Sequence, residues 1–188
     1  MQLTGKSAMD IKNINCREKD SYNLANDYLG KIFSDCWKEL QGVRASALKV
    51  KTGVEKISVF IQQATRMTCP KCKDVCCISK HGYYNFEDLV YLHALGLKPP
   101  PLEFEKNDND PCRFLTEKGC SIERQFRPSG CNWYFCGALF DYMENKPEYQ
   151  EFDDTLTNIA ALWMKMINDF TTAGQTVSMS WLPEFNSI

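Results

Sequence analysis

Eight cysteines in the middle of the chain are the residues best suited to chemistry. They open with a C-x2-C-x3-C-C run and continue at wider intervals: Cys69, Cys72, Cys76, Cys77, Cys112, Cys120, Cys131 and Cys136. Two cysteines separated by two residues can converge on one metal, because the turn between them brings both sulfurs to the same side. Thiolates suit both zinc and iron–sulfur clusters. The pattern therefore predicts a thiolate metal site with all eight as candidate ligands.

The spacing favours an iron–sulfur cluster over zinc. Structural zinc usually takes separated pairs of ligands, and adjacent cysteines such as Cys76 and Cys77 fit a single tetrahedral ion poorly. The corners of a cubane [4Fe-4S] cluster lie apart, so neighbouring cysteines can reach different corners or different clusters. The thiolates can serve two four-cysteine sites, or one site with some cysteines left for other roles. We expect an iron–sulfur cluster first and zinc second.

The residues around these cysteines carry a family pattern. After the opening run come Cys112-Arg-Phe-Leu, Gly119-Cys120-Ser-Ile-Glu, Arg127-Pro-Ser-Gly-Cys131 and Phe135-Cys136. This order resembles the YkgJ-type cysteine-cluster family, described as zinc- or iron-chelating domains. That family usually opens with C-x2-C-x2-C-C, whereas one extra residue lies within 73–75 here, and Arg113 stands where proline is usual. The resemblance covers about residues 69–136.

The resemblance implies metal chelation and no settled reaction. Larger relatives, the flagellin lysine methylases, couple such a cysteine cluster to methyl transfer, but nothing in this chain independently indicates a methyl-donor site. Arg127 matches the family's Arg-Pro element and is a candidate cofactor-binding residue, since its guanidinium can compensate the negative charge of the site. A salt bridge that only holds the loop is an equal alternative for Arg127.

Other residues near the cysteines have two interpretations each. His81 can complete a mixed site, although a surface histidine is the commoner outcome, and His93 is expected to pack on a helix. The Trp-Tyr-Phe run over 133–135 either shields a cluster from water or fills a small core. Cys36 is expected to be a buried small hydrophobe. Cys16 is expected to be a free thiol with no assigned role.

Helices are expected on both sides of the cysteine segment. Apolar residues recur at three- and four-residue steps over 24–40 and 48–64, which predicts two helices with a break at Gln41-Gly42, packed as an antiparallel pair. A short helix over 137–145 and a longer one, begun by Pro147 and capped by Gly174, are expected near the end. The tail over 175–188 is expected to dock on the body through Trp181 and its apolar neighbours.

The middle of the chain is expected to be rich in loops. One helix is predicted from Asn85 as its cap to Leu95, stopped by Gly96, and a short hairpin around 116–119. Such a segment has little core of its own, so metal ligation takes the place of the missing burial. The expected fold is mainly α, with flanking helices packed around a loop-rich, cysteine-ligated middle and at most a short β-hairpin. We expect one domain over 1–188, made of a helical region (1–67), a cysteine-rich metal-binding segment (68–136), and a helical region with a tail (137–188).

Composition limits the function classes. The chain has 188 residues, of which 44% are hydrophobic and 24% charged, as in an ordinary globular protein, and a net charge of -2 does not favour nucleic-acid binding. No signal-like or membrane-spanning apolar stretch is evident, so we expect a cytoplasmic protein with reduced thiols, and metal ligation before disulfides.

Three functions stay open at this stage. The first is a metal-binding protein, redox-active if it holds an iron–sulfur cluster. The second is a zinc-stapled module that binds a protein partner. The third is a cluster-dependent enzyme similar to the methylases, so whether the chain is an enzyme is left undecided.

Overall fold

The fold is mainly helical with one short β-hairpin, as the sequence predicts. A computed structural model describes residues 14–73 and 75–181 of the chain. The elements, in order, are α1 (Lys19–Asp35), α2 (Gln41–Thr68), η2 (Cys69–Lys71), η3 (Ser79–His81), α3 (Phe86–Ala94), β1 (Leu115–Thr116), β2 (Gly119–Cys120), η4 (Arg124–Phe126), α4 (Gly130–Trp133), α5 (Gly137–Met143) and α6 (Tyr149–Trp181).

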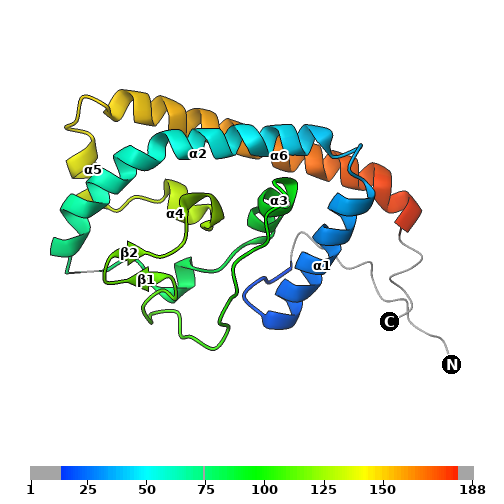
Figure 1. Cartoon of the computed structure of the whole chain (residues 1–188), viewed down its shortest axis with the longest axis horizontal. Coiled ribbons are helices and arrows are strands. Elements are labelled where there is room, and N and C mark those ends of the chain that lie inside the picture. Colours follow the sequence, from blue (N-terminus) through cyan, green and yellow to red (C-terminus); the bar gives the residue numbers. More distant parts are fainter. Residues whose placement is uncertain (1–13, 74, 182–188) are drawn as a thin grey trace.

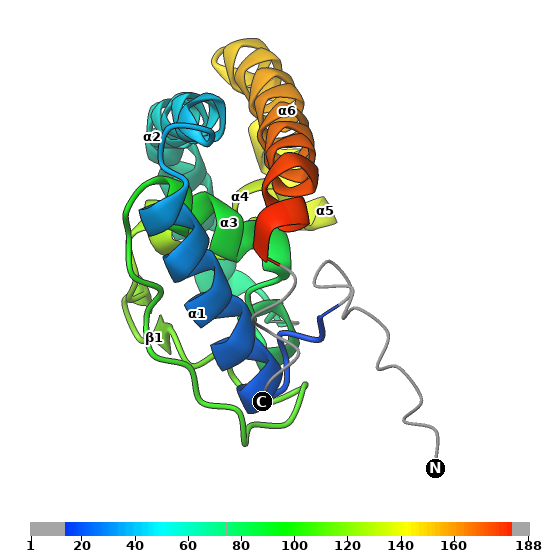
Figure 2. The same cartoon turned by 90° about the vertical axis from the view of Figure 1, so that its right-hand side faces the viewer.

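The two longest helices, α2 and α6, run antiparallel and form one layer (Figure 1). The cysteine-bearing loops, the hairpin, α3 and α4 lie on one side of this layer, and α1 lies at its far end (Figure 1). Turned by 90°, the molecule shows α2 and α6 next to each other above the other elements (Figure 2). The long helices thus form a platform for the loop-rich middle.

The predicted antiparallel pairing of the first two helices is wrong. The main partner of α1 is α3, and the main partner of α2 is α6. Gly53, in the middle of α2, shows why α6 packs so closely. A Cβ at this position would lie 2.6 Å from a side-chain carbon of Ile159 on α6, so only glycine allows the approach. A residue that looks unfavourable for a helix is therefore required by packing.

Several element boundaries differ from the predictions. The first helix ends at Asp35, and the turn between the two helices lies at 36–40. Gln41, where the sequence predicts the break, is the first residue of α2. Trp37, placed on the apolar stripe, lies in the connecting turn and is 50% exposed. Pro147 lies two residues before α6, in the preceding turn, and α6 continues past Gly174 to Trp181. The rest of the predicted docking tail, 182–188, lies outside the described residues.

The middle of the chain follows the predictions closely. Asn85 caps α3 through a capping box with Asp88, whose backbone N–H donates to the Asn85 side chain at 2.7 Å. Gly96 follows the helix with a φ of +69°, a left-handed conformation that favours glycine. The hairpin pairs Leu115 with Cys120 across a turn that ends at Gly119, whose φ is +101°.

Candidate metal centre

A short backbone ladder joins the first cysteine run to the loop before the hairpin. The Cys112 N–H donates to the carbonyl of Cys77 at 2.9 Å, and the Ser79 N–H donates to the carbonyl of Asp110 at 2.8 Å. Ile78 and Pro111 form an antiparallel bridge between these two hydrogen bonds. The ladder therefore places Cys77 beside Cys112, although they are far apart in the sequence.

The hairpin and α4 bring two more cysteines to the same place. Leu115 donates its N–H to the Cys112 carbonyl at 2.8 Å and pairs with Cys120 across the hairpin. The Cys131 thiol donates to the carbonyl of His81, with a sulfur–oxygen distance of 3.7 Å. We call Cys77, Cys112, Cys120 and Cys131 the hairpin set.

Electrostatics show that the members of the hairpin set influence one another. Burial, together with negative charge on Cys120, Cys112 and Cys77, raises the pKa of Cys131 to about 12. Burial also raises the pKa of Cys77 to about 11, aided by charge on Cys76, Cys112, Cys69 and Cys120. Negative charge on Cys112 or Cys120 thus disfavours ionisation of both Cys77 and Cys131.

The remaining cysteines of the motif form a second group where α2 ends. Cys69 and Cys72 span the single turn η2, in which the Cys72 N–H donates to the Cys69 carbonyl at 3.1 Å. Cys136 caps the start of α5, which packs against α2. Burial raises the pKa of Cys69 and of Cys76, and charge on Cys136 and Cys72 raises both further. We call Cys69, Cys72, Cys76 and Cys136 the α2-end set.

Two arginines that the sequence did not single out as site residues lie beside the hairpin set. The three guanidinium nitrogens of Arg113 are buried and have no hydrogen-bond partner among the described residues. The Arg113 guanidinium lies 4.5 Å from the ring centroid of Tyr83. Arg124 is also buried, and one of its nitrogens donates to the Cys131 carbonyl at 3.3 Å. The only signal for Arg113 in the sequence was its departure from the proline usual in the family.

Burial affects these cations as well as the thiols. Burial and the charge of Arg127 lower the pKa of Arg124 to about 10, although charge on Cys120 and Cys131 opposes this shift. Arg127 Nε donates to the backbone carbonyl of Ile122 at 3.1 Å. This hydrogen bond holds the loop through a carbonyl and not through a carboxylate. Its charge also lowers the pKa of Cys131. The predicted cofactor-binding residue therefore lies close to the hairpin set.

Gly82 packs directly on a cysteine of the hairpin set. A Cβ at this position would lie 2.9 Å from Cys112 Sγ and 4.0 Å from Arg113 Nε. Gly82 is buried and has a φ of -90°, so close packing and not backbone strain requires glycine here. Gly130 and Gly137, next to Cys131 and Cys136, have no atom within 4 Å of an added Cβ.

The donor atoms suit a thiolate-bound metal, but the sulfurs are not drawn together. None of the ten cysteines, all of which lie in the described residues, forms a disulfide. Within residues 14–73 and 75–181, no three His, Cys, Asp or Glu side chains are arranged closely enough to hold one metal ion. The unpaired nitrogens of Arg113 fit the expectation of an anionic group nearby, since an unsatisfied buried cation is costly.

The other predicted residues separate into buried and exposed ones. Cys36 is buried, as predicted, and so is Cys16, whose pKa is raised to about 11 mainly by burial. His93 packs as expected: its ring nitrogen lies 3.0 Å from Asn26 Oδ1, and its ring stacks on Phe33. His81 stacks its ring on Tyr134.

The aromatic run between two cysteines mostly fills the core. Trp133 contacts Trp163 of α6 edge to face, with 4.9 Å between ring centroids. Phe135 is buried and packs on Phe152 of the same helix. Tyr134 is 60% exposed and points away from that core. Two of the three aromatic side chains therefore attach the cysteine segment to α6.

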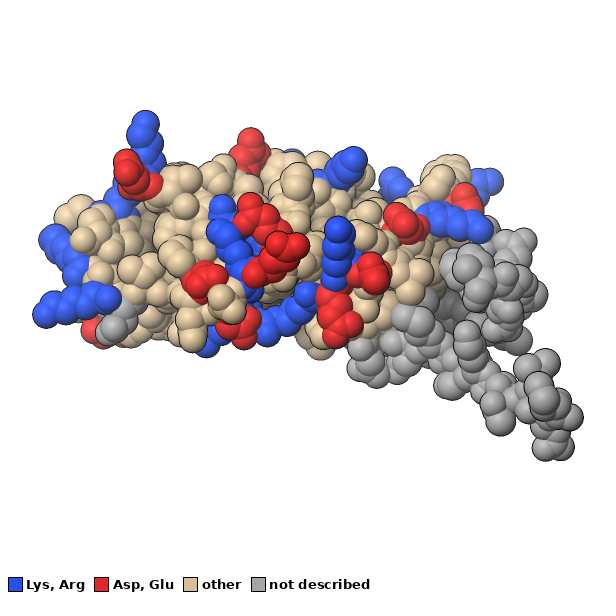
Figure 3. Space-filling view, turned by 90° about the horizontal axis from the view of Figure 1, so that it is seen from below, with Lys and Arg blue, Asp and Glu red and all other residues tan. Residues whose placement is uncertain are grey.

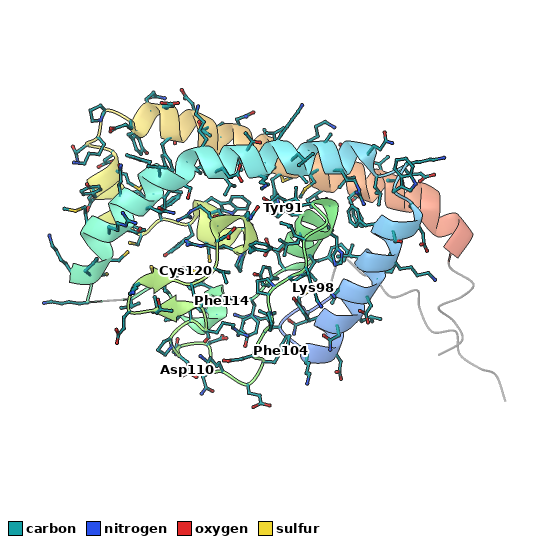
Figure 4. All side chains as sticks on the ribbon, in the orientation of Figure 1. Tyr91, Lys98, Phe104, Asp110, Phe114 and Cys120 are labelled. Carbon is teal, nitrogen blue, oxygen red and sulfur yellow. The ribbon has the colours of Figure 1, made fainter. Side chains whose placement is uncertain are left out.

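Two members of the hairpin set, Cys77 and Cys120, are exposed, and Cys120 lines a groove. An open groove of about 490 Å³ lies between α2 and the segment from Cys120 to Arg127, and Glu55, Ser58 and Gln62 of α2 line its other side. Figure 4 shows Cys120 on the hairpin, close to α4. Basic and acidic side chains are interspersed over the face seen from below (Figure 3). No helix in the described part of the chain combines the length and apolarity required to cross a membrane.

Comparisons with known proteins do not extend this description. No protein-family model matches the chain, and neither a curated protein nor a solved structure is significantly similar to it. The resemblance to the YkgJ-type family therefore stays a prediction. The fold and the cysteines define the chain only by class: a mainly helical protein with a loop-rich segment that holds eight of its ten cysteines.

Proposed function

We propose that this chain binds metal through the cysteine thiolates between residues 69 and 136, as an iron–sulfur cluster in preference to zinc. One observation carries the proposal: the fold returns the later cysteines to the opening C-x2-C-x3-C-C run. Cys112 is hydrogen-bonded to Cys77 through the backbone, and charge on Cys136 raises the pKa of Cys69. Cysteines kept only as small hydrophobes would not gather in this way, as the separately buried Cys16 and Cys36 illustrate.

The positive charges of three nearby arginines support the proposal. A buried guanidinium without hydrogen-bond partners, such as that of Arg113, is costly unless an anion lies near it. Metal-bound thiolates are such anions, and their sulfurs accept hydrogen bonds that tune a bound metal. Arg113, Arg124 and Arg127 would compensate this charge, while the cysteines would supply the ligands.

The thiol pKa values show what a metal must do to bind. At neutral pH, Cys77 and Cys131 hold their protons, because their pKa values are raised to about 11 and about 12. A bound metal replaces these protons, so binding releases protons and strengthens as the pH rises. The loops carry little regular structure and can move the sulfurs onto a metal without unfolding a helix. A bound iron–sulfur cluster would supply electron transfer.

The test is the metal and acid-labile sulfide content of the full chain purified without oxygen, together with its absorption spectrum. We expect brown protein with iron and sulfide in equal amounts. Cys77→Ser should lower the metal content, whereas Cys36→Ser should leave it unchanged, because Cys36 is buried on the helical frame away from both sets. Equal metal retention in both variants, or a chain that binds neither iron nor zinc, would refute the proposal.

A colourless protein with tightly bound zinc would instead favour a zinc-stapled interaction module, in which the metal holds the loops in place. Specific binding of a methyl donor would favour a methylase-like enzyme. The iron–sulfur proposal is preferred because adjacent Cys76 and Cys77 suit one tetrahedral ion poorly.

A further inference from the structure

We infer that the cavity between α1, the end of α3 and the start of α2 binds a small organic anion through a phosphate or carboxylate group. The cavity has a volume of about 330 Å³ and is open to solvent. This volume lies near the lower end of the range for ligand sites, so it suits a small molecule and not a macromolecule. The cavity is formed by elements other than the cysteine-bearing loops, so the inference does not depend on the proposed metal binding.

Both charged side chains that line the cavity are cationic. Arg44 belongs to α2, and Lys98 lies in the loop after α3, between α3 and α1 (Figure 4). No Asp or Glu among the described residues lines the cavity. Acidic residues of the adjacent helices, such as Asp27, Asp35 and Asp169, lie outside its lining. Two cations that converge on one concave site without an acidic partner attract an anion.

Arg44 keeps hydrogen-bonding capacity beyond its contacts within the fold. One of its terminal nitrogens donates to the Phe33 carbonyl at 3.0 Å, and its guanidinium lies 5.8 Å from the centroid of the Phe33 ring. Its Nε is buried and has no hydrogen-bond partner among the described residues. A buried donor without a partner is costly, and a guanidinium binds carboxylate and phosphate oxygens through strong, charge-assisted hydrogen bonds. A bound oxyanion would therefore supply the partner that the fold does not.

Neutral polar groups in the cavity can complete the contacts with an oxyanion. Asn26 Oδ1 lies 3.0 Å from His93 Nε2, and this pairing leaves the Asn26 amide nitrogen as a donor for a ligand. The Ser34 hydroxyl, also in the lining, is a second donor. Burial lowers the pKa of His93, so its imidazole is uncharged at pH 7 and the positive charge of the cavity comes from Arg44 and Lys98.

A glycine leaves space on the wall that α1 forms. Gly30 lies in the interior of α1, and an added Cβ would make an ordinary contact, 3.5 Å from a ring carbon of His93. Packing therefore does not require glycine here, unlike at Gly53, although glycine weakens the interior of a helix. The space beside Gly30 belongs to the cavity. Apolar surface for the rest of the ligand comes from Phe33, Leu97 and Pro99.

Titration of the full chain with small anions tests the site. The first probe is inorganic phosphate, followed at constant pH and ionic strength through the ring proton resonances of His93 in NMR spectra. The chain has two histidines, so the resonances that remain in His81→Gln are those of His93. We expect these resonances to shift and saturate. Phenyl phosphate and benzoate are the next probes: tighter binding of the first would assign a phosphate to the ligand, and tighter binding of the second a carboxylate.

Two substitutions and a control show whether the cations of the cavity hold the anion. Arg44→Gln should weaken phosphate binding roughly 10- to 100-fold, because it removes charge-assisted hydrogen bonds. Lys98→Gln should weaken it about two- to fivefold, since Lys98 is exposed. Lys49→Gln removes an equal charge from an exposed position of α2 outside the cavity and should leave binding unchanged. Circular dichroism checks the fold of Arg44→Gln, and Lys98→Gln carries the test if that variant unfolds.

Three outcomes would overturn the inference. The first is the lack of saturable binding for all three probes. The second is an equal loss in Lys98→Gln and Lys49→Gln, which would indicate a general attraction of anions to surface charge. The third is binding that survives in Arg44→Gln and Lys98→Gln but is lost in Arg113→Met, which would place the anion beside the hairpin set. None of these outcomes changes the metal content of the chain, so the proposed function is tested separately.

Discussion

The hairpin set and the α2-end set use the same ligand atom in different surroundings. The hairpin set is tied by a backbone ladder and a β-hairpin, and two buried arginines lie against it. The α2-end set follows a single helical turn, and the cations near it are exposed. The difference teaches that a cysteine pattern does not determine how well its members are positioned. We expect the hairpin set to be the more preorganised of the two and the more dependent on its neighbours.

The largest expected difference between the sets is in thiol reactivity. In the metal-free, reduced chain at pH 8, Cys131 should react with iodoacetamide more slowly than the exposed Cys69, since only the thiolate reacts and the pKa of Cys131 is raised to about 12. Its rate should rise about tenfold per pH unit up to that pKa. Mass-spectrometric mapping of the modified cysteines over time measures both rates. Equal rates would remove the distinction between the sets.

The raised pKa values of Cys77 and Cys131 also make the stability of the metal-free chain depend on pH. The folded chain keeps protons on Cys77 and Cys131 above pH 9, where an unfolded chain loses them. The metal-free fold should therefore lose stability as the pH rises from about 9 toward 12, because the folded state then binds more protons than the unfolded state. Chemical denaturation at several pH values measures the slope.

The second prediction concerns the buried cation of the hairpin set. Arg113→Met keeps an unbranched side chain and removes the guanidinium, which lies over the Tyr83 ring and has no hydrogen-bond partner among the described residues. We expect the metal affinity of the hairpin set to fall about 10- to 100-fold, as for other residues that tune a bound metal. The metal-free chain should become more stable by about 1–3 kcal/mol, because an unsatisfied buried donor is removed. Chelator competition and denaturation measure the two effects.

Opposite signs are the diagnostic feature of this prediction. A side chain that only packs would lower the stability of the metal-free chain when removed. Lys71→Met is the matched control on the α2-end set, and it should change metal affinity by no more than a few-fold, because Lys71 is exposed and its charge is screened. An equal loss of metal affinity in Arg113→Met and Lys71→Met would contradict the expected difference between the two sets.

The third prediction tests the close packing at Gly82. Gly82→Ala should weaken metal binding by the hairpin set by about tenfold, since a Cβ would lie 2.9 Å from Cys112 Sγ and overpacking costs roughly 1–3 kcal/mol. Gly130→Ala is the control, because it lies next to Cys131 and an added Cβ meets no atom within 4 Å. Zinc competition assays on both variants measure the effect. Unchanged binding in Gly82→Ala would show that Cys112 Sγ moves away when metal binds.

The smallest expected effect comes from Asp88, which connects α3 to the hairpin set. Its carboxylate accepts from the Ser129 N–H at 2.8 Å, just before Cys131, and burial raises its pKa to about 6. A carboxyl group with a raised pKa stabilises the fold at low pH and loses that contribution as the pH rises through about 6. Relative to Asp88→Asn, the wild type should therefore lose on the order of 1 kcal/mol between pH 4 and pH 7. Chemical denaturation of both proteins at both pH values measures this loss. An equal difference in unfolding free energy between the two proteins at pH 4 and pH 7 would contradict the prediction.

Local signals in the sequence were sufficient for part of the fold. The two ends of α3, at Asn85 and Gly96, could be predicted because helix capping and a left-handed backbone conformation are properties of single residues. The buried Cys36 and the packed His93 also followed from their places on helical stripes. The helix partners did not follow, since the close approach at Gly53 depends on Ile159 in a distant helix.

The candidate site shows the same division. The sequence by itself determined which atoms are available: eight thiols, their order along the chain, and Arg127 among them. Only the tertiary structure decided which thiols are neighbours, because the ladder at Cys77 and Cys112 and the anchoring of 133–135 on α6 are contacts between distant segments. It also decided that Arg113 is a buried, unpaired cation. Burial and proximity, not residue type, set the charge that a thiol experiences, and both arise only when the chain folds.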